Sequence, residues 1–241
     1  MKTYKIATII SAAGSSQRMG GIKKEYCLLG SDYKDNTDKP LTVLGSAVST
    51  FASSKQIEII IVTVPLNTET GECAARESIP EYLLKEDSFP KILFIPGGKN
   101  RRISIHHSLV LLSAYTPDFV LIHDGARPWI DIGLIERIID GAIEYGAVIP
   151  TLPLLETPKE IDKKGFVQRH LRRSNVETAQ TPQGFAYPEI LLAHEKASEK
   201  ELRENIEYTD DAEVWGEFVG PVKTINGSPA NRKITFPEDL I

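Results

Sequence analysis

The sequence is poor in cysteine, since its 241 residues include only Cys27 and Cys73. The two lie far apart and form no C-x-x-C pair, which argues against a disulfide framework and against a cysteine zinc site. Such sparing use of cysteine is typical of a cytoplasmic protein. The apolar stretch within residues 1–14 is too short to span a membrane, and it is typical of a strand rather than a signal peptide.

An excess of positive charge is lacking as well. The chain has 28 Lys and Arg residues against 33 Asp and Glu, which gives a net charge of -5. This balance predicts no general attraction to nucleic acid or to an anionic membrane, so neither is an expected partner. With 41% hydrophobic and 25% charged residues, the composition is that of an ordinary globular protein with a sizeable core.

Several common catalytic motifs are absent. No G-x-G-x-x-G fingerprint occurs, because Ser16 stands where its second glycine would be, and there is no G-x-x-x-x-G-K-[ST] loop. No histidine belongs to an H-E-x-x-H pair, and His106 and His107 are sequence neighbours that do not share a helical face. No G-x-S-x-G elbow appears. These absences argue against hydride transfer from a dinucleotide, zinc hydrolysis and serine-hydrolase chemistry.

Short apolar runs alternate with stretches of helical spacing along most of the chain. The runs cover residues 5–11, 57–64, 91–96, 118–124 and 146–152, and their continuous apolar character is typical of strands buried on both faces. The helical stretches are 41–54, 73–86, 101–115 and 131–146. This alternation predicts a single doubly wound α/β domain over residues 1–241, with a mostly parallel sheet.

Two polar segments interrupt that pattern. Residues 156–178 are charged and show no core face, so they form either a protruding hairpin arm or a flexible surface loop. Residues 30–40 are a turn-rich insertion, which we expect to be surface decoration.

Small residues and cations follow three of the expected strands. "AAGSSQRM" follows the first strand, "PGGKNRRIS" the third, and "HDGARP" the fourth. Ligands bind at the carboxyl ends of strands in open α/β sheets, so the three loops together predict a polyphosphate site. Taken alone, the first loop is equally well a tight turn with solvated charges. Asp124 alone is equally well a helix cap or a salt-bridge partner of Arg127, or a ligand of a metal or a ribose.

Five motifs together resemble one family. In chain order they are "SAAGSSQRMGGIKKEY" (11–26), "GGKNRRISI" (97–105), "HDGARP" (123–128), "TAQTPQGF" (178–185) and "NRKITFPEDL" (231–240). They resemble the 2-C-methyl-D-erythritol 4-phosphate cytidylyltransferase family of the non-mevalonate isoprenoid pathway. The resemblance implies a single Rossmann-like domain, a homodimer, and transfer of CMP from CTP to a sugar-alcohol phosphate. Pyrophosphate is the other product, and magnesium is the implied cofactor.

The resemblance also implies roles for individual residues. The implied catalytic residues are Arg18, Lys24 and Lys233. The implied nucleotide-binding residues are Ala12, Ala13, Gly14, Gly98, Arg101, Ser104 and Asp124, with Asp124 also a metal ligand. The implied substrate-binding residues are Arg127, Thr157, Arg173, Thr181 and Thr209. In the family the arm at 156–178 crosses a two-fold axis, so Arg173 is expected to serve the neighbouring subunit.

The sequence departs from the family pattern in several places. Ser16 replaces the second loop glycine, Lys23 replaces a usual proline, and residues 30–40 are inserted. The chain stops at Ile241, where the family usually continues into a helix, so we expect a difference in the last packing element.

Two other functions compete with this interpretation. The nearer one is a pentitol (ribitol) 5-phosphate cytidylyltransferase, against which "SAAG" and "HDGARP" favour methylerythritol phosphate. The other is a nucleotide-sensing domain without catalysis, and retention of Arg18, Lys24 and Lys233 argues against it.

Overall fold

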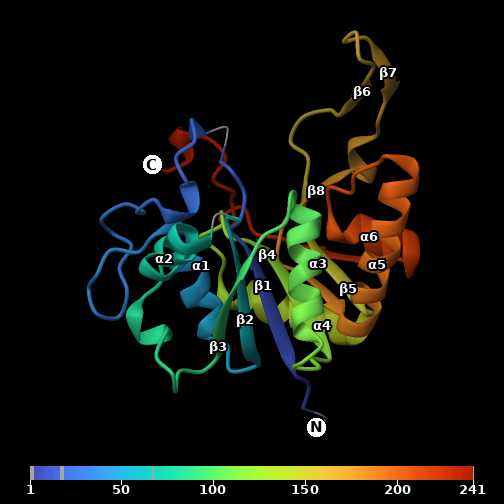
Figure 1. Cartoon of the computed structure of the whole chain (residues 1–241). Coiled ribbons are helices and arrows are strands. Elements are labelled where there is room, and N and C mark those ends of the chain that lie inside the picture. The colour runs from blue at the N-terminus through green and yellow to red at the C-terminus, as the bar shows by residue number, and fades with distance from the viewer. Residues whose placement is uncertain (1–2, 17–18, 67, 241) are drawn as a thin grey trace.

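The computed structural model describes residues 3–16, 19–66 and 68–240 and is built around an eight-stranded sheet (Figure 1). Its strand order is β10-β5-β9-β4-β1-β2-β3, and β8 pairs with the carboxyl end of β5, beyond the residues of β5 that pair with β9. The bounds are β1 (Ile6–Ser11), β2 (Ile57–Val64), β3 (Lys91–Pro96), β4 (Phe119–Asp124), β5 (Ala147–Pro153), β8 (Glu177–Ala179), β9 (Gln183–Ala186) and β10 (Lys223–Asn226). The five expected strands are β1 to β5.

Parallel pairing joins β1 to both β2 and β4, β2 to β3, and β5 to β10. β9 runs antiparallel to its neighbours β4 and β5, and β8 runs antiparallel to β5. The mostly parallel α/β sheet predicted from the sequence is therefore confirmed. Because β1 and β4 pair in register, Ser11 at the end of β1 lies beside Asp124 at the end of β4.

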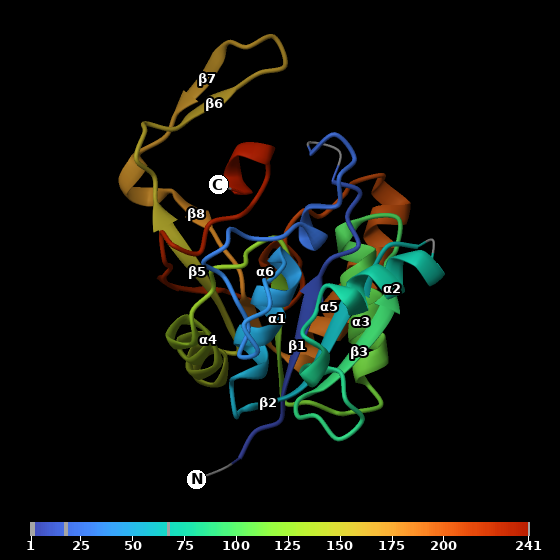
Figure 2. The same cartoon turned by 90° about the vertical axis from the view of Figure 1, so that its left-hand side faces the viewer.

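Helices cover both faces of the sheet (Figures 1 and 2). One face is packed by α1 (Val43–Ala52), α2 (Thr68–Glu77) and α4 (Ile132–Tyr145). The other face is packed by α3 (Arg101–Leu112), α5 (Tyr187–Glu204) and α6 (Asp211–Phe218). Among the described residues, no helix is long and apolar enough to cross a lipid bilayer.

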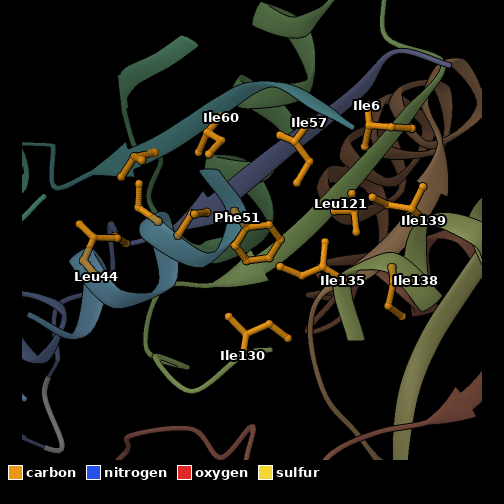
Figure 3. Close-up of a cluster of buried hydrophobic side chains, with 14 of the residues drawn as sticks. Ile6, Leu44, Phe51, Ile57, Ile60, Leu121, Ile130, Ile135, Ile138 and Ile139 are labelled. Carbon is orange, nitrogen blue, oxygen red and sulfur yellow. The ribbon is translucent and has the colours of Figure 1, made fainter. Parts of the chain in front are cut away.

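The core follows from the side-chain alternation of the central strands. On β1, Ile6 and Ile10 pack into the cluster beneath α1 and α4, whereas Ile9 packs against the α3 side. Figure 3 shows the first of these clusters, in which Phe51 of α1 and Ile135 of α4 meet over the sheet. Strands buried on both faces explain why these runs are apolar without polar alternation.

One helix differs from its expected position. The sequence pattern predicted a helix over 73–86, but α2 covers Thr68–Glu77 and a short 3-10 turn, η3, follows at Glu81–Leu83. Pro80 explains the early end, because it lacks a backbone N–H and cannot continue a helix. The strands β8, β9 and β10 and the helices α5 and α6 were not predicted.

The polar segment 156–178 forms a hairpin that stands away from the body of the molecule (Figures 1 and 2). Its strands β6 (Lys159–Ile161) and β7 (Val167–His170) pair only with each other, antiparallel. A 3-10 turn, η4 (Arg173–Asn175), follows before β8 leads the chain back to the sheet. The hairpin is therefore the predicted arm rather than an irregular loop.

The insertion at 30–40 is also ordered. Isolated bridges join Leu28 to Thr42 and Lys34 to Pro40, so the segment folds back on itself. At its tip the Asp35 carboxylate accepts hydrogen bonds from the backbone N–H groups of Thr37 and Lys39.

Candidate active site

A cleft of about 670 Å³ opens at the carboxyl ends of β1, β3 and β4. This is the edge of the sheet at which the sequence placed a polyphosphate site. Its lining residues come from three loops and from the C-terminal segment: Ser11, Ala13, Gly14, Ser15, Ser16, Met19, Lys24, Glu25, Gly98, Lys99, Asn100, Arg101, Ser104, Asp124, Ala126, Lys233 and Thr235.

The first loop approaches the cleft with its backbone. A Cβ atom placed on Gly14 would meet nothing within 4 Å, so this glycine borders open space. Ser16 has a φ of 50°, the left-handed region that a non-glycine residue rarely adopts. Its hydroxyl donates to Glu25 Oε2 at 3.2 Å and accepts from the Lys24 N–H at 3.4 Å. These two side-chain contacts hold Ser16 in a conformation that glycine adopts without strain.

The two lysines assigned a catalytic role lie in the same cleft, although 209 positions of sequence separate them. Lys24 stands on a 3-10 turn, η2 (Lys24–Tyr26), and its Nζ donates to the backbone oxygen of Ile234 at 2.7 Å. Lys233 Nζ lies 2.9 Å from Asp124 Oδ2. Arg18, the third residue of this set, lies outside the described residues.

Asp124 is the centre of a cluster of cations. Besides Lys233, the Nε atoms of Arg127 and Arg101 lie 3.3 and 3.5 Å from its carboxylate oxygens. Burial acts to raise the pKa of Asp124, but the three positive charges outweigh it and hold that pKa far below its usual range. The carboxylate is therefore ionised at neutral pH.

A buried hydrogen-bond chain fixes Asp124 from behind. The Asp124 N–H donates to Thr181 Oγ1 at 3.0 Å, and Thr181 Oγ1 lies 3.1 Å from His123 Nδ1. His123 Nε2 lies 3.2 Å from the Arg127 carbonyl oxygen. Burial lowers the pKa of His123 to about 4, so the ring is neutral. Since the carbonyl can only accept, Nε2 carries the proton and Nδ1 accepts from the Thr181 hydroxyl.

The amino end of α3 forms the opposite side of the cleft. Asn100 caps this helix by accepting from the Ile103 N–H, and the Ser104 hydroxyl accepts from the Gly98 N–H at 2.9 Å. Gly97 is required here, because a Cβ on it would lie 2.3 Å from Ala13 Cβ of the first loop. The positive end of the α3 helix dipole favours an anion at this place.

Arg101 bridges the cleft and the core. Its Nη1 lies 2.6 Å from Asp211 Oδ2, and Asp211 Oδ1 lies 3.3 Å from His194 Nε2. Burial acts to lower the pKa of Arg101, but the carboxylates of Asp211 and Asp124 raise it above its usual value. The guanidinium is thus permanently charged and held between two carboxylates.

The structure places the predicted site residues in three groups. Those in the cleft wall are Ala13, Gly14, Lys24, Gly98, Arg101, Ser104, Asp124 and Lys233. Ala12, Arg127 and Thr181 are buried next to this wall without lining it. Thr157, Arg173 and Thr209 are exposed and are not part of the cleft. The Arg173 guanidinium instead donates to the Leu155 carbonyl at 2.8 Å, within the arm.

Sequence reasoning missed several residues that shape this site. Ser15, Glu25, Lys99 and Asn100 line the cleft, and they lie in loops that had already been singled out. Asn231 was missed for a different reason. It is fully buried, and its Nδ2 donates to the Thr181 carbonyl while its own carbonyl accepts from Arg127. Only the folded chain brings these partners together.

The cleft suits a metal ion that is shared with a substrate. Among the described residues, no group of three His, Cys, Asp or Glu side chains is arranged to hold a metal ion. Mg²⁺ in phosphoryl-transfer sites is bound by one or two carboxylates together with substrate phosphates and water. Asp124, an ionised carboxylate in the cleft wall, fits that role.

The fold and the cleft define a class of protein: an α/β protein that binds a phosphorylated nucleotide at the carboxyl edge of its sheet. A family model described as IspD, 2-C-methyl-D-erythritol 4-phosphate cytidylyltransferase, matches residues 6–241.

Comparison with individual proteins points to the same family. The 2-C-methyl-D-erythritol 4-phosphate cytidylyltransferase of Desulforamulus reducens is 35% identical over 98% of this chain and 93% of its own length. The corresponding protein of Dehalococcoides mccartyi is 36% identical over the same shares. The crystal structure of 4-diphosphocytidyl-2C-methyl-D-erythritol synthase from Anaerococcus prevotii has a TM-score of 0.76 at 28% identity, covering 98% of this chain and 93% of that one.

The chain belongs to the 2-C-methyl-D-erythritol 4-phosphate cytidylyltransferase family. It is a nucleotidyltransferase of the non-mevalonate isoprenoid pathway, and these matches favour methylerythritol phosphate over the ribitol phosphate alternative.

Proposed function

We propose that Lys24, Lys233 and a magnesium ion at Asp124 carry the transfer of CMP from CTP to 2-C-methyl-D-erythritol 4-phosphate. The observation that supports this most is the meeting of Lys24 and the segment around Lys233 in one cleft, through the bond from Lys24 Nζ to Ile234 O at 2.7 Å. Two loops from opposite ends of the chain thereby present cations to the same space.

The chemistry needs little proton transfer. The acceptor phosphate is largely dianionic near neutral pH and attacks the α-phosphorus of CTP without a general base, while pyrophosphate leaves. The main obstacle is repulsion, since two unit charges 4 Å apart repel by about 4 kcal/mol at an effective dielectric constant of 20. Lys24 and Lys233 offset this repulsion and stabilise the charge that grows on the α-phosphoryl oxygens.

Other groups of the cleft position the nucleotide. The first loop at Gly14 presents its backbone to the triphosphate, and Gly98 and Ser104, at the amino end of α3, contact the base and ribose, as the family resemblance implies. A magnesium ion, when bound, neutralises phosphate charge and orients the leaving pyrophosphate. Asp124 would hold it, with the substrate phosphates as further ligands.

We also propose that the protein is a homodimer in which the arm at 156–178 completes the acceptor site of the partner. Exposed apolar side chains on the arm support this proposal: Phe166 is 67% exposed and Ile161 61%. Apolar side chains that gather on one protruding element can mark a protein–protein contact. Arg173 does not line the cleft of its own chain, so its expected phosphate-binding role needs a second subunit. Sparing use of cysteine supports a cytoplasmic location.

Release of pyrophosphate from CTP tests the reaction. Methylerythritol 4-phosphate and ribitol 5-phosphate are supplied as rival acceptors, with CTP alone as the blank. We expect release that depends on methylerythritol phosphate and is at least about tenfold slower with the pentitol phosphate, the discrimination that about 1.4 kcal/mol gives. Equal rates with both acceptors would contradict the assignment of the acceptor.

A further inference from the structure

The cleft that receives the triphosphate contains a second carboxylate, Glu25. This side chain lines the cleft and is 5% exposed. A buried anion in a phosphate site repels the ligand unless a cation compensates it. Asp124, the first carboxylate of the cleft, is compensated by three cations. Glu25 is touched by none of those three.

Lys23 supplies the compensating charge for Glu25. Its Nζ lies 3.1 Å from Glu25 Oε2, and its side chain is 17% exposed. The same ammonium donates to the backbone oxygen of Gly14, a second electron-rich atom at the cleft. Lys23 itself does not line the cleft. It therefore acts on the cleft through the groups that it contacts.

Glu25 in turn holds the first loop in shape. It accepts a hydrogen bond from Ser16 Oγ at 3.2 Å, and Ser16 is the residue with a φ of 50°. The Lys23 ammonium is hydrogen-bonded to the loop at Gly14, and the Glu25 carboxylate is hydrogen-bonded to it at Ser16. The two side chains thus connect two residues of the loop, Gly14 and Ser16, to the segment that carries Lys24.

We propose that Lys23 and Glu25 form a charge-compensated clasp that sets the shape and the charge of the triphosphate loop. Lys23 is a positioning residue in this clasp: it neutralises Glu25 and donates a hydrogen bond to the Gly14 carbonyl oxygen of the loop. The inference rests on the proposed binding of CTP in this cleft.

The clasp predicts effects on CTP affinity that depend on charge rather than on packing. Lys23→Met keeps the length of the side chain but leaves Glu25 uncompensated, so we expect the Kd for CTP to rise about tenfold and kcat to change less than about threefold. Lys23→Arg keeps the charge and should stay within about threefold of the unmodified Kd. Glu25→Gln removes the anion, so CTP should bind at least as tightly as to the unmodified protein.

The decisive variant combines the two changes. In Lys23→Met with Glu25→Gln, no charge is left uncompensated, and the Kd for CTP should return to within about threefold of the unmodified value. Lys34→Met is the matched control, because it breaks an exposed ion pair with Asp38 at 2.8 Å in the insertion, away from the cleft. It should leave the Kd unchanged.

Equilibrium titration with CTP measures these constants, and a thermal unfolding curve shows that each variant is folded. An unmodified protein that does not bind CTP would refute the proposed function itself. If the unmodified protein binds CTP, the clasp is overturned by a Lys23→Met variant of normal affinity, or by a double variant that remains as weak as Lys23→Met. Should Lys23→Met fail to fold, Glu25→Gln decides alone, since weaker CTP binding in that variant contradicts charge compensation.

Discussion

Replacement of Lys233 by methionine should lower turnover far more than it weakens CTP binding. Lys233 lies at the cleft with its Nζ 2.9 Å from Asp124, and 37% of its side chain is exposed. A unit charge about 4 Å from the α-phosphoryl oxygens contributes about 4 kcal/mol at an effective dielectric constant of 20. Exposure to water and the shared charge with Asp124 reduce this value. We therefore expect kcat to fall about a hundredfold, at the lower end of the range for loss of one oxyanion donor.

The assay is steady-state pyrophosphate release over a range of CTP concentrations. A group that acts mainly on the transition state changes kcat and kcat/KM together, so the KM for CTP should move less than about threefold. Lys223→Met is a matched control, because Lys223 is an exposed lysine of β10 that lies over the Tyr145 ring instead of the cleft. Its kinetic constants should match those of the unmodified enzyme.

A raised KM with normal kcat in Lys233→Met would refute this reasoning, because it would show that Lys233 binds ground state and transition state equally. Lys24→Met should cost at least as much turnover. Its side chain is buried, at 8% exposure for the residue, and water screens its charge less than that of Lys233.

Three further predictions concern the metal, the charge cluster and the arm. Excess chelator should abolish turnover and added Mg²⁺ should restore it, with CTP preferred over UTP and ATP; full activity in chelator contradicts the metal, and equal rates contradict the base preference. Asp124→Asn should lower the free energy of unfolding by about 3 kcal/mol at pH 7. The pKa of Asp124 is lower in the folded protein than in the unfolded chain, where it is near 4. The stabilisation from its charge is therefore present above about pH 4 and is lost as the pH falls toward the folded pKa. In urea unfolding, the difference in unfolding free energy between the unmodified protein and Asp124→Asn should shrink below about pH 4. Mixing inactive Lys24→Ala and Arg173→Ala subunits should restore activity toward half of normal per mixed dimer, and exchange confirmed by mass without recovery contradicts an arm that acts across subunits.

Local pattern was enough to predict the centre of the fold. The strands β1, β2 and β4 are continuous runs rich in β-branched residues because both of their faces are buried. The later elements gave weaker signals. β9 is only four residues long, Gln183–Ala186, and contains a glycine. α5 buries only a narrow stripe that includes Ile190, Ala193 and Ala197, and many of its other residues are charged. Its helical periodicity of apolar residues is therefore weak in the sequence.

The residues that line the cleft were predictable from the sequence, but the residues that hold them in place were not. The rule that parallel strands end at the same edge brought Asp124, Arg101 and the first loop together, and the structure confirms their convergence. The supporting layer was not predictable, because its contacts join residues far apart in sequence. Asn231 reaches Thr181 across 50 positions, and Arg101 reaches Asp211 across 110.

Two interpretations of Asp124 were left open by the sequence, a salt-bridge partner of Arg127 and a ligand of a metal or a ribose. The structure shows the salt bridge, at 3.3 Å, and extends it to Lys233 and Arg101. The two roles do not exclude each other. Asp124 and Asp211 together carry two negative charges against the three positive charges of Lys233, Arg127 and Arg101, and the remaining positive charge favours a triphosphate in the cleft. In the proposed reaction, phosphate oxygens would take over the contacts of Lys233, and Asp124 would then have a carboxylate oxygen for the proposed magnesium ion. The same charge balance that holds Asp124 in place therefore favours a triphosphate beside it.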